Sequence, residues 1–188
     1  MIEPSALDLS IFHFLNGDGG EVMDAIMVWV SGRLSWVFLY ALMLWGVFRK
    51  VGWKNFLWFI LAVALIVTLA DQTCNLAKNN FSKFRPMCYE PLQGLIHTVE
   101  GYKCGLYGTF SSHAANTMGV SVLVAAIIGR RWVWWGLMIW VALICYSRIY
   151  LAAHYPYDIF FGLVVGSVYG WLFAVLYSKF ILKKKKRK

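Results

Sequence analysis

Charged residues are scarce in this chain of 188 residues. They form 14% of the sequence, while hydrophobic residues form 60% and the mean hydropathy is +0.61. Soluble domains typically contain about 25% charged and about 45–50% apolar residues, so this scarcity excludes an ordinary water-soluble fold. Since a membrane-spanning helix takes about 20 apolar residues, the chain has room for about five or six such helices and for no separate soluble domain.

Positive charge is absent from the first 32 residues, which are acidic instead. The absence excludes a secretory signal peptide, because such a peptide begins with a basic region. It also places the N-terminus on the outer side of the membrane. Residues 7–15 are apolar but too few to span a bilayer, so we expect a helix that lies in the interface. The sequence Asn-Gly-Asp-Gly-Gly at 16–20 should end this helix.

Basic residues are few outside the C-terminal tail. The formal net charge is +9, and subtracting the six basic residues of 183–188 leaves +3. A basic run directly after a hydrophobic segment is typical of a cytoplasmic anchor that lies against anionic headgroups. We therefore expect a single membrane-embedded domain over 1–182 and a cytoplasmic polybasic tail over 183–188. The sequence has no basic groove with interleaved aromatic residues, so nucleic acid is not an expected partner.

Compact groups of metal ligands are lacking as well, so the sequence predicts neither a metal nor a cofactor. Four cysteines are present. Cys74 and Cys145 fall in or near hydrophobic runs, where we expect inert buried thiols. Cys88 and Cys104 lie 16 positions apart in a polar segment on the outer side. We expect these two to form a disulfide, with free thiols as the alternative.

Hydrophobic runs predict an all-α fold, a polytopic membrane bundle of five or six transmembrane helices with an interfacial loop region on the outer side. The expected spans cover residues 23–48, 56–77, 114–128, 133–145 and 159–182. The first of these makes two short helices, and hence a sixth span, if it breaks near residues 31–33. Basic residues in the loops after the first and third expected spans place those loops inside. The N-terminus and the segments 78–112 and 147–157 then lie on the outer side.

Two cations begin the long outer segment. Lys78 closes an expected span, and Arg85 follows seven residues later, directly before Pro86. At this spacing both side chains can converge on one anion, since Arg offers a planar fork for phosphate oxygens and Lys a point charge. Taken alone, the pair also fits snorkelling anchors at the end of a span.

A serine pair and a histidine stand where the outer segment enters the next span. Ser111 is a natural N-cap, and the free N–H groups near Ser112, together with the helix dipole, favour an anion. His113 lies in the same first turn and can protonate a leaving oxygen. A capped helix with an interfacial histidine is the alternative interpretation.

A third cluster follows the next span. His154 and Asp158 are four residues apart, so we expect them on one face of a helix. The carboxylate can then accept the Nδ1–H of His154 and leave the Nε2 lone pair free as a nucleophile. Arg148, at the end of the preceding span, adds a third cation.

For the other ionisable residues, the sequence does not predict where the side chains lie relative to the three clusters. Asp71 lies inside an expected span, where we predict a structural contact to Arg148 or to a neighbouring helix. Lys83 and several charged residues of the outer segment are expected to shape the choice of substrate.

Together the three clusters resemble the motifs of the type 2 phosphatidic acid phosphatase family, Lys-x6-Arg-Pro, Pro-Ser-Gly-His and Ser-Arg-x5-His-x3-Asp. The first and third match at every defining position. The second has Phe110 where the family has Pro and Ser112 where it has Gly. The resemblance implies that His154 attacks phosphorus, His113 moves the proton and Asp158 orients the nucleophile. The phosphate would be held, without a metal, by Lys78, Arg85, Ser111, Ser112 and Arg148.

The resemblance also implies a substrate and a location. The substrate would be a phosphate or pyrophosphate monoester of a membrane lipid, cleaved on the periplasmic face of a bacterial inner membrane. The chain is as short as the small bacterial undecaprenyl pyrophosphate phosphatases, which favours undecaprenyl pyrophosphate. Lipid A phosphatases and phosphatidylglycerolphosphate phosphatases share the motifs and are alternatives. A lipid-phosphate binder or transporter without turnover is a further alternative, although it has no use for His113, His154 or Asp158.

Overall fold

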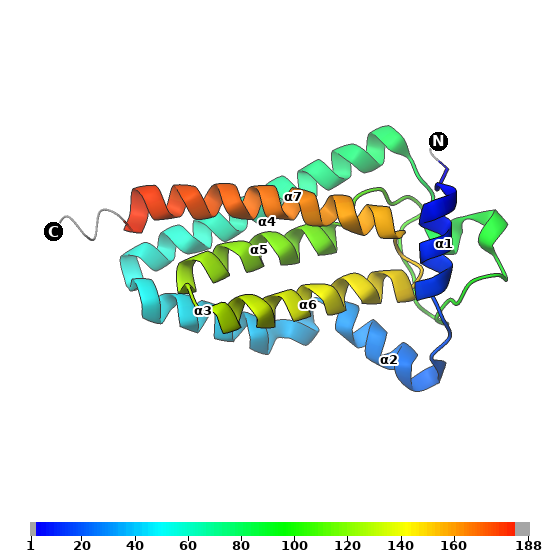
Figure 1. The fold of residues 1–188 in the computed structure, drawn as a ribbon, viewed down its shortest axis with the longest axis horizontal. Helices are drawn as coiled ribbons and strands as arrows, with labels where there is room; N and C mark the ends of the chain where they lie inside the picture. Colours follow the sequence, from blue (N-terminus) through cyan, green and yellow to red (C-terminus); the bar gives the residue numbers. More distant parts are fainter. Residues whose placement is uncertain (1–2, 183–188) are drawn as a thin grey trace.

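The computed structural model describes residues 3–182, and this part of the chain is a bundle of α-helices (Figure 1). Two short helices come first, α1 (Ala6–Leu15) and α2 (Gly20–Ser31). The bundle of the described chain consists of α3 (Val37–Val51), α4 (Trp53–Phe81), α5 (Ser112–Ile128), α6 (Arg131–Tyr150) and α7 (Pro156–Tyr177). Single turns complete it: η1 (Leu34–Trp36), η2 (Pro86–Cys88), η3 (Glu90–Leu92) and η4 (Ser178–Leu182). The predicted tail at 183–188 lies outside the described residues.

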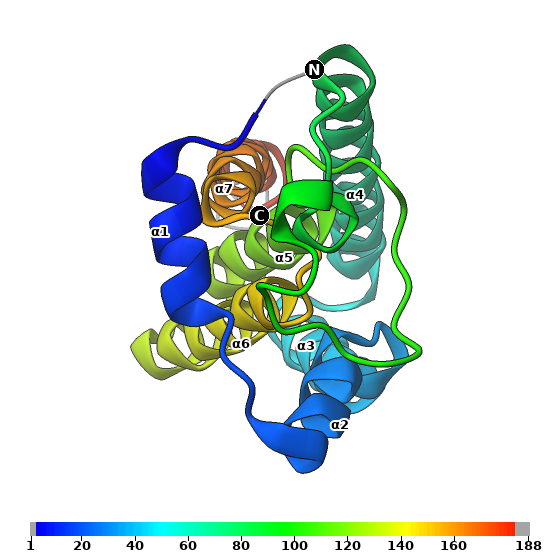
Figure 2. The same cartoon turned by 90° about the vertical axis from the view of Figure 1, so that its right-hand side faces the viewer.

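Four helical segments of the described chain are long and apolar enough to cross a membrane: Leu34–Val51, Trp53–Phe81, Arg131–Tyr150 and Pro156–Ile181. The fifth bundle helix, α5, is apolar but has only 17 residues. It lies in the middle of the bundle and packs against α4, α6 and α7 (Figure 2). The chain is therefore an all-α, multi-pass membrane protein, which confirms the predicted fold class.

The first expected span is broken in the structure. α2 ends at Ser31, Gly32 is extended, and α3 begins five residues later at Val37. A Cβ atom on Gly32 would lie 2.6 Å from the Ser35 Oγ atom, so a larger residue at this break would crowd Ser35. Residues 23–48 therefore form two helices, as the break near residues 31–33 suggests.

Helix α1 lies across one end of the bundle, at the opposite end from the C-terminal end of α7 (Figure 1). It packs against α6 and α7. Asp8 and Phe12, one helical turn apart, are its buried residues, whereas Phe14 is 86% exposed. The interfacial helix predicted at residues 7–15 thus buries a carboxylate together with an aromatic ring.

Helices α5 and α7 approach each other through glycines. Gly162, Gly166 and Gly170 recur every fourth residue along α7 and face the backbone of α5. A Cβ atom on Gly162 would lie 2.6 Å from the Ser111 carbonyl oxygen, and one on Gly166 would collide with the Ala115 carbonyl oxygen. Small residues allow such close backbone approach in membrane helices. This packing brings the N-terminal ends of α5 and α7 together.

Candidate functional site

A polar pocket of about 500 Å³ lies where the N-terminal ends of α5 and α7 meet the C-terminal ends of α4 and α6. It is lined by six of the eight predicted site residues: Lys78, Arg85, Ser112, His113, Arg148 and His154. Ser111 and Asp158 do not line the pocket but support residues that do. The structure therefore brings together three clusters that are separated by up to 76 positions in the sequence.

The Lys78–Arg85 cluster spans the end of α4 and the loop after it. Helix α4 ends at Phe81, and Ser82 follows in a left-handed conformation, which turns the chain back toward the pocket. The Arg85 side chain donates from Nε to the Tyr107 carbonyl oxygen at 3.0 Å and from Nη1 to the Ala153 carbonyl oxygen at 3.1 Å. Two separate loops thus hold this guanidinium in place.

The N-terminus of α5 adopts the predicted capped geometry. The Ser111 hydroxyl accepts a hydrogen bond from the Ala114 N–H at 3.4 Å. The Ser111 N–H itself donates to the Asp158 carbonyl oxygen at 3.0 Å, which ties this helix start to α7. Phe110, where the family pattern has Pro, stacks on Phe161 of α7 with ring centroids 5.1 Å apart.

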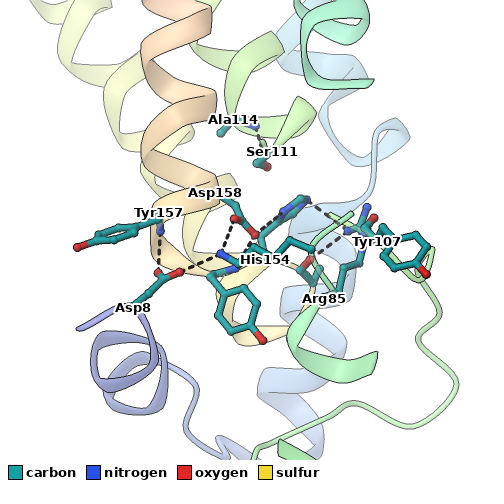
Figure 3. Close-up of polar contacts among 11 residues, drawn as sticks. Asp8, Arg85, Tyr107, Ser111, Ala114, His154, Tyr157 and Asp158 are labelled. Atoms are coloured by element: carbon teal, nitrogen blue, oxygen red, sulfur yellow. Dashed lines mark hydrogen bonds and ion pairs between the residues drawn. The ribbon is translucent and has the colours of Figure 1, made fainter. Parts of the chain in front are cut away.

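The His154–Asp158 contact is present, but its predicted backbone geometry is wrong. His154 does not lie on a helix, because α7 begins at Pro156. Proline disfavours helical backbone conformation in the residue before it, here Tyr155, so the helix does not extend back to His154. Asp158 instead folds back from the first turn of α7 and accepts from the Tyr155 N–H at 3.1 Å. Its other contact through Oδ2 is the His154 Nδ1 atom at 3.4 Å (Figure 3).

The hydrogen bonds of His154 determine its tautomer. Arg85 Nη1 lies 3.3 Å from His154 Nε2, and a guanidinium can only donate. Nε2 therefore accepts, and Nδ1 carries the proton and faces Asp158. Burial, together with the positive charges of Arg85, Arg148 and Lys83, holds the pKa of His154 well below its ordinary value. The imidazole is thus neutral, with its Nε2 lone pair on the pocket side.

Arg148 is a buried cation with spare hydrogen-bonding capacity. Its Nη1 donates to the hydroxyls of Ser31 and Tyr102, the latter at 2.6 Å. Its Nε has no partner among the described residues. An unpaired buried donor on a charged group is unfavourable, and an oxyanion in the pocket would satisfy it.

The pocket is strongly positive. Arg33 and Lys103 line it in addition to the three predicted cations, and within residues 3–182 no carboxylate lines it. Gly108 also borders the site, where a Cβ atom would lie 3.0 Å from Arg85 Cγ and 3.2 Å from His154 Cε1. The arrangement can bind a tetrahedral oxyanion and attack it with an imidazole nitrogen.

An apolar groove of about 470 Å³ adjoins the polar pocket. It runs between α3, α4 and α5, and Ser31, Gly32, Arg33, Ser112 and His113 line both cavities. A molecule with an anionic head and a hydrocarbon chain can therefore occupy both at once.

The sequence predicted for neither Asp8 nor Lys83 a role in supporting the His154–Asp158 pair. Lys83 does not line the pocket but is buried, 3.0 Å from Asp8 Oδ2 and 2.9 Å from Asp158 Oδ1, so its predicted role in substrate choice is wrong. Asp8 also accepts from the Tyr157 N–H at 2.9 Å (Figure 3). The only sequence signal for Asp8 is that it shares a helix face with Phe12, whose ring is fully buried.

Two further expectations have different outcomes. Asp71 accepts a hydrogen bond from Asn116 Nδ2 of α5 at 2.9 Å, so the expected contact to a neighbouring helix is confirmed. The expected disulfide is wrong, because Cys88 and Cys104 are both free thiols. The Cys104 thiol contacts the sulfur of Met87 at 2.9 Å instead, and burial raises its pKa.

One group of metal-type ligands forms only in the tertiary structure, away from the pocket. Among residues 3–182, Asp18, Asp24 and His97 place ligand atoms within 4.8 Å of one another. His97 Nε2 lies 2.8 Å from Asp24 Oδ1, and the Tyr150 hydroxyl donates to the same oxygen at 2.6 Å. These contacts link α2, the outer loop and α6.

Comparison with known proteins gives consistent results. Residues 56–182 match the PAP2 superfamily. The chain is 33% identical to a lipid A 4'-phosphatase of Bacteroides thetaiotaomicron, over 93% of this chain and 79% of that protein. It is 26% identical to an undecaprenyl-diphosphatase of Sulfolobus acidocaldarius, over 94% and 82% of the two chains. The crystal structure of LpxE from Aquifex aeolicus has the same fold, with a TM-score of 0.71 at 21% identity over 92% and 97% of the chains.

Proposed function

The chain belongs to the PAP2 superfamily and is an integral-membrane lipid phosphatase, and from this premise we propose that it removes a phosphate from a lipid A-type glycolipid. The observation that carries this substrate is the 33% identity to a lipid A 4'-phosphatase over 93% of the chain. The continuity between the cationic pocket and the apolar groove supports a lipid with an anionic headgroup. We propose that the reaction takes place on the periplasmic face of the inner membrane, and the positive-inside pattern of the loop charges supports this side.

In the proposed first step, the Nε2 lone pair of His154 attacks phosphorus. A P–N bond forms while the P–O bond to the lipid breaks, and His113, protonated when the anionic phosphate occupies the pocket, donates its proton to the leaving oxygen. The Nδ1–H of His154 stays hydrogen-bonded to Asp158, which stabilises the positive charge that develops on the ring. The dephosphorylated lipid then leaves, and a phosphohistidine remains.

In the proposed second step, water hydrolyses the phosphohistidine. Neutral His113 takes a proton from the water while the oxygen attacks phosphorus. The P–N bond breaks, its electron pair returns to Nε2, and inorganic phosphate is released. Both histidines then have their starting protonation states.

We propose that the cations replace the stabilisation that a metal ion supplies in other phosphoryl-transfer enzymes. Arg85 rests against His154 Nε2 before substrate binds, so an incoming phosphoryl oxygen can take over its donor. Arg148 Nε is ready for another oxygen, since it has no partner in the described chain. Lys78, which also lines the pocket, adds a further positive charge.

Undecaprenyl diphosphate is a second candidate substrate. The specific observation that favours it is the presence of two cations beyond the three motif cations, Arg33 and Lys103, in a pocket that no carboxylate of residues 3–182 lines. A diphosphate carries a second phosphate that these side chains can neutralise. The identity to an undecaprenyl-diphosphatase supports the same candidate, which stays a prediction.

The test is phosphate release by purified protein in EDTA from lipid A, undecaprenyl diphosphate, phosphatidylglycerolphosphate and phosphatidic acid. We expect kcat/KM to be highest for lipid A and unaffected by EDTA, because the proposed site needs no metal. The variant His154→Ala is the inactive control, and Glu100→Gln removes an exposed carboxylate outside the pocket as the matched active control. A higher kcat/KM for undecaprenyl diphosphate than for lipid A would make undecaprenyl diphosphate the favoured substrate. Binding of all four lipids with release from none would identify a binder.

A further inference from the structure

A buried chain of charges connects helix α1 to the nucleophile. Asp8, Lys83 and Asp158 contact one another in series, and each is less than 6% exposed. Asp8 belongs to α1, which lies outside residues 56–182 that match the family. Asp8 lies in none of the three motif clusters, and Lys83 stands at an undefined x position of the first one, Lys-x6-Arg-Pro.

The contacts among these three charged side chains leave them little freedom to rotate. The Lys83 ammonium lies 3.0 Å from Asp8 Oδ2 and 2.9 Å from Asp158 Oδ1, and 4.3 Å from the centre of the Tyr155 ring. The second oxygen of Asp8 accepts from the Tyr157 N–H, and the second oxygen of Asp158 contacts His154. Every carboxylate oxygen thus has at least one donor or contact, and Asp158 Oδ2 also accepts from the Tyr155 N–H, which restricts the rotation of both carboxylates.

Burial makes each member dependent on the others. A buried ion pair contributes little net stability, but removing one partner leaves an uncompensated charge in a low-dielectric site. Lys83 is shared between two carboxylates, so its loss would leave both of them unpaired. The position of Asp158, and with it the orientation of His154, therefore depends on a side chain from α1.

We propose that Asp8 and Lys83 are positioning residues for the nucleophile: Lys83 holds Asp158 against His154, and Asp8 holds Lys83. The inference rests on the proposed function, because it assigns a purpose to the orientation of His154. The site is complete only when α1 is docked across the end of the bundle.

The charges around the His154–Asp158 pair define what each variant does to proton binding. The pair faces Lys83 and Arg85 from the loop after α4, Arg148 from α6 and His113 from α5. Asp8 of α1 faces the pair through Lys83. Since the pair must lose its proton before Nε2 can attack, the acidic limb of the kcat/KM profile reports the proton affinity of the pair.

The two variants shift this limb in opposite directions. Lys83→Met removes a positive charge, which raises the proton affinity of the pair, so the acidic limb moves to higher pH by about one unit. Asp8→Asn removes a negative charge, so the limb moves to lower pH. We also expect kcat/KM at neutral pH to fall by about 10²-fold in Lys83→Met, as for other small displacements of reacting groups.

Two further variants distinguish a positioning role from general destabilisation of the protein. One is a conservative replacement that should keep activity, and the other is a double variant that tests whether the two residues act together. Lys83→Arg keeps the charge and can reach both carboxylates, so it should keep most of the activity and the wild-type limb. Adding Asp8→Asn to Lys83→Met removes one of the two unpaired carboxylates, so the double variant should be at least as active as Lys83→Met. Lys54→Met, an exposed lysine at the other end of α4, and Glu100→Gln are the matched controls and should show the wild-type profile.

The measurement is the pH profile of kcat/KM for all variants, with monodispersity in detergent as the check on folding. The inference is supported if the acidic limb shifts in opposite directions in Lys83→Met and Asp8→Asn. It also requires that the double variant loses less activity than the sum of the two single losses. Identical profiles in Lys83→Met and Asp8→Asn, or additive losses, would overturn it. If Lys83→Met does not fold, the acidic limb of Asp8→Asn alone tests the inference. A shift to lower pH supports it, and an unchanged limb overturns it. A wild-type protein that releases phosphate from no lipid contradicts the proposed function instead.

Discussion

At the scale of the residue, a few atoms decide the chemistry of the pocket. Arg85 can only donate, and this forces His154 Nε2 to accept and Nδ1 to face Asp158. The same arginine covers Nε2, the atom that we propose as the nucleophile. In the proposed mechanism, single hydrogen bonds therefore determine which nitrogen reacts.

The two histidines should give different losses when each is replaced. His154→Ala removes the nucleophile, so both turnover and any acid-labile phosphoenzyme should disappear. His113→Ala keeps the attacking imidazole and the cations, so it should bind vanadate as the wild type does while kcat falls by about 10²–10⁴-fold. Phosphate release, phosphoenzyme trapping and vanadate inhibition measure these effects. A silent His113→Ala, or covalent phosphate in His154→Ala, would contradict the roles assigned here.

At the scale of the element, two helix starts position the site. The N-terminus of α5 carries Ser111, Ser112 and His113, and the N-terminus of α7 carries Asp158. They are held together by the Ser111 N–H bond to the Asp158 carbonyl oxygen and by glycines farther along α7. The geometry of the pocket therefore depends on how closely two helices approach.

A bulky residue at the α5–α7 contact should disturb both stability and activity. Gly166→Leu places side-chain atoms against the backbone of Ala115, and we expect a loss of about 1–3 kcal/mol from overpacking. The helices would also separate, so kcat should fall even below the melting temperature. Gly136→Ala is the matched control, because nothing lies within 4 Å of its added Cβ atom. Thermal unfolding in detergent and phosphate release provide the measurements, and equal behaviour of the two variants would contradict this role for the glycines.

At the scale of the whole molecule, the two ends of the bundle carry different features. α1, the long loop between α4 and α5 and the pocket lie at one end, and the C-terminal end of α7 lies at the other (Figure 1). The apolar groove runs from the pocket along α3, α4 and α5. A lipid can therefore present its headgroup to the pocket while its chains stay beside the helices.

This arrangement predicts the topology in the membrane. A reporter fused after the C-terminus should be active only as a cytoplasmic type, because the positive-inside rule predicts that the basic loops at 49–54 and 130–131 lie inside. A single cysteine placed at Glu100, in a variant without the four native cysteines, should react with a membrane-impermeant maleimide in intact spheroplasts. A cysteine at Lys54 is the control and should be protected until the membrane is opened. Labelling of both sites, or of Lys54 alone, would contradict the assigned orientation.

The sequence by itself determined the class of fold and most of the pocket. Hydrophobic run lengths depend only on local composition, so an all-α membrane bundle followed directly. The motif spacings identified the three clusters, including the N-cap at Ser111, because capping is a property of neighbouring residues.

Only the tertiary structure decided which charges share one site. Asp8 and Lys83 lie 75 residues apart, as do Lys83 and Asp158, and no local pattern shows that a carboxylate of an interfacial helix is buried against them. The helical geometry expected for His154 was wrong because Pro156 starts α7, and the contact depends on a fold-back of Asp158. Long-range packing settles burial and partners, whereas sequence spacing constrains only residues within a few turns of each other.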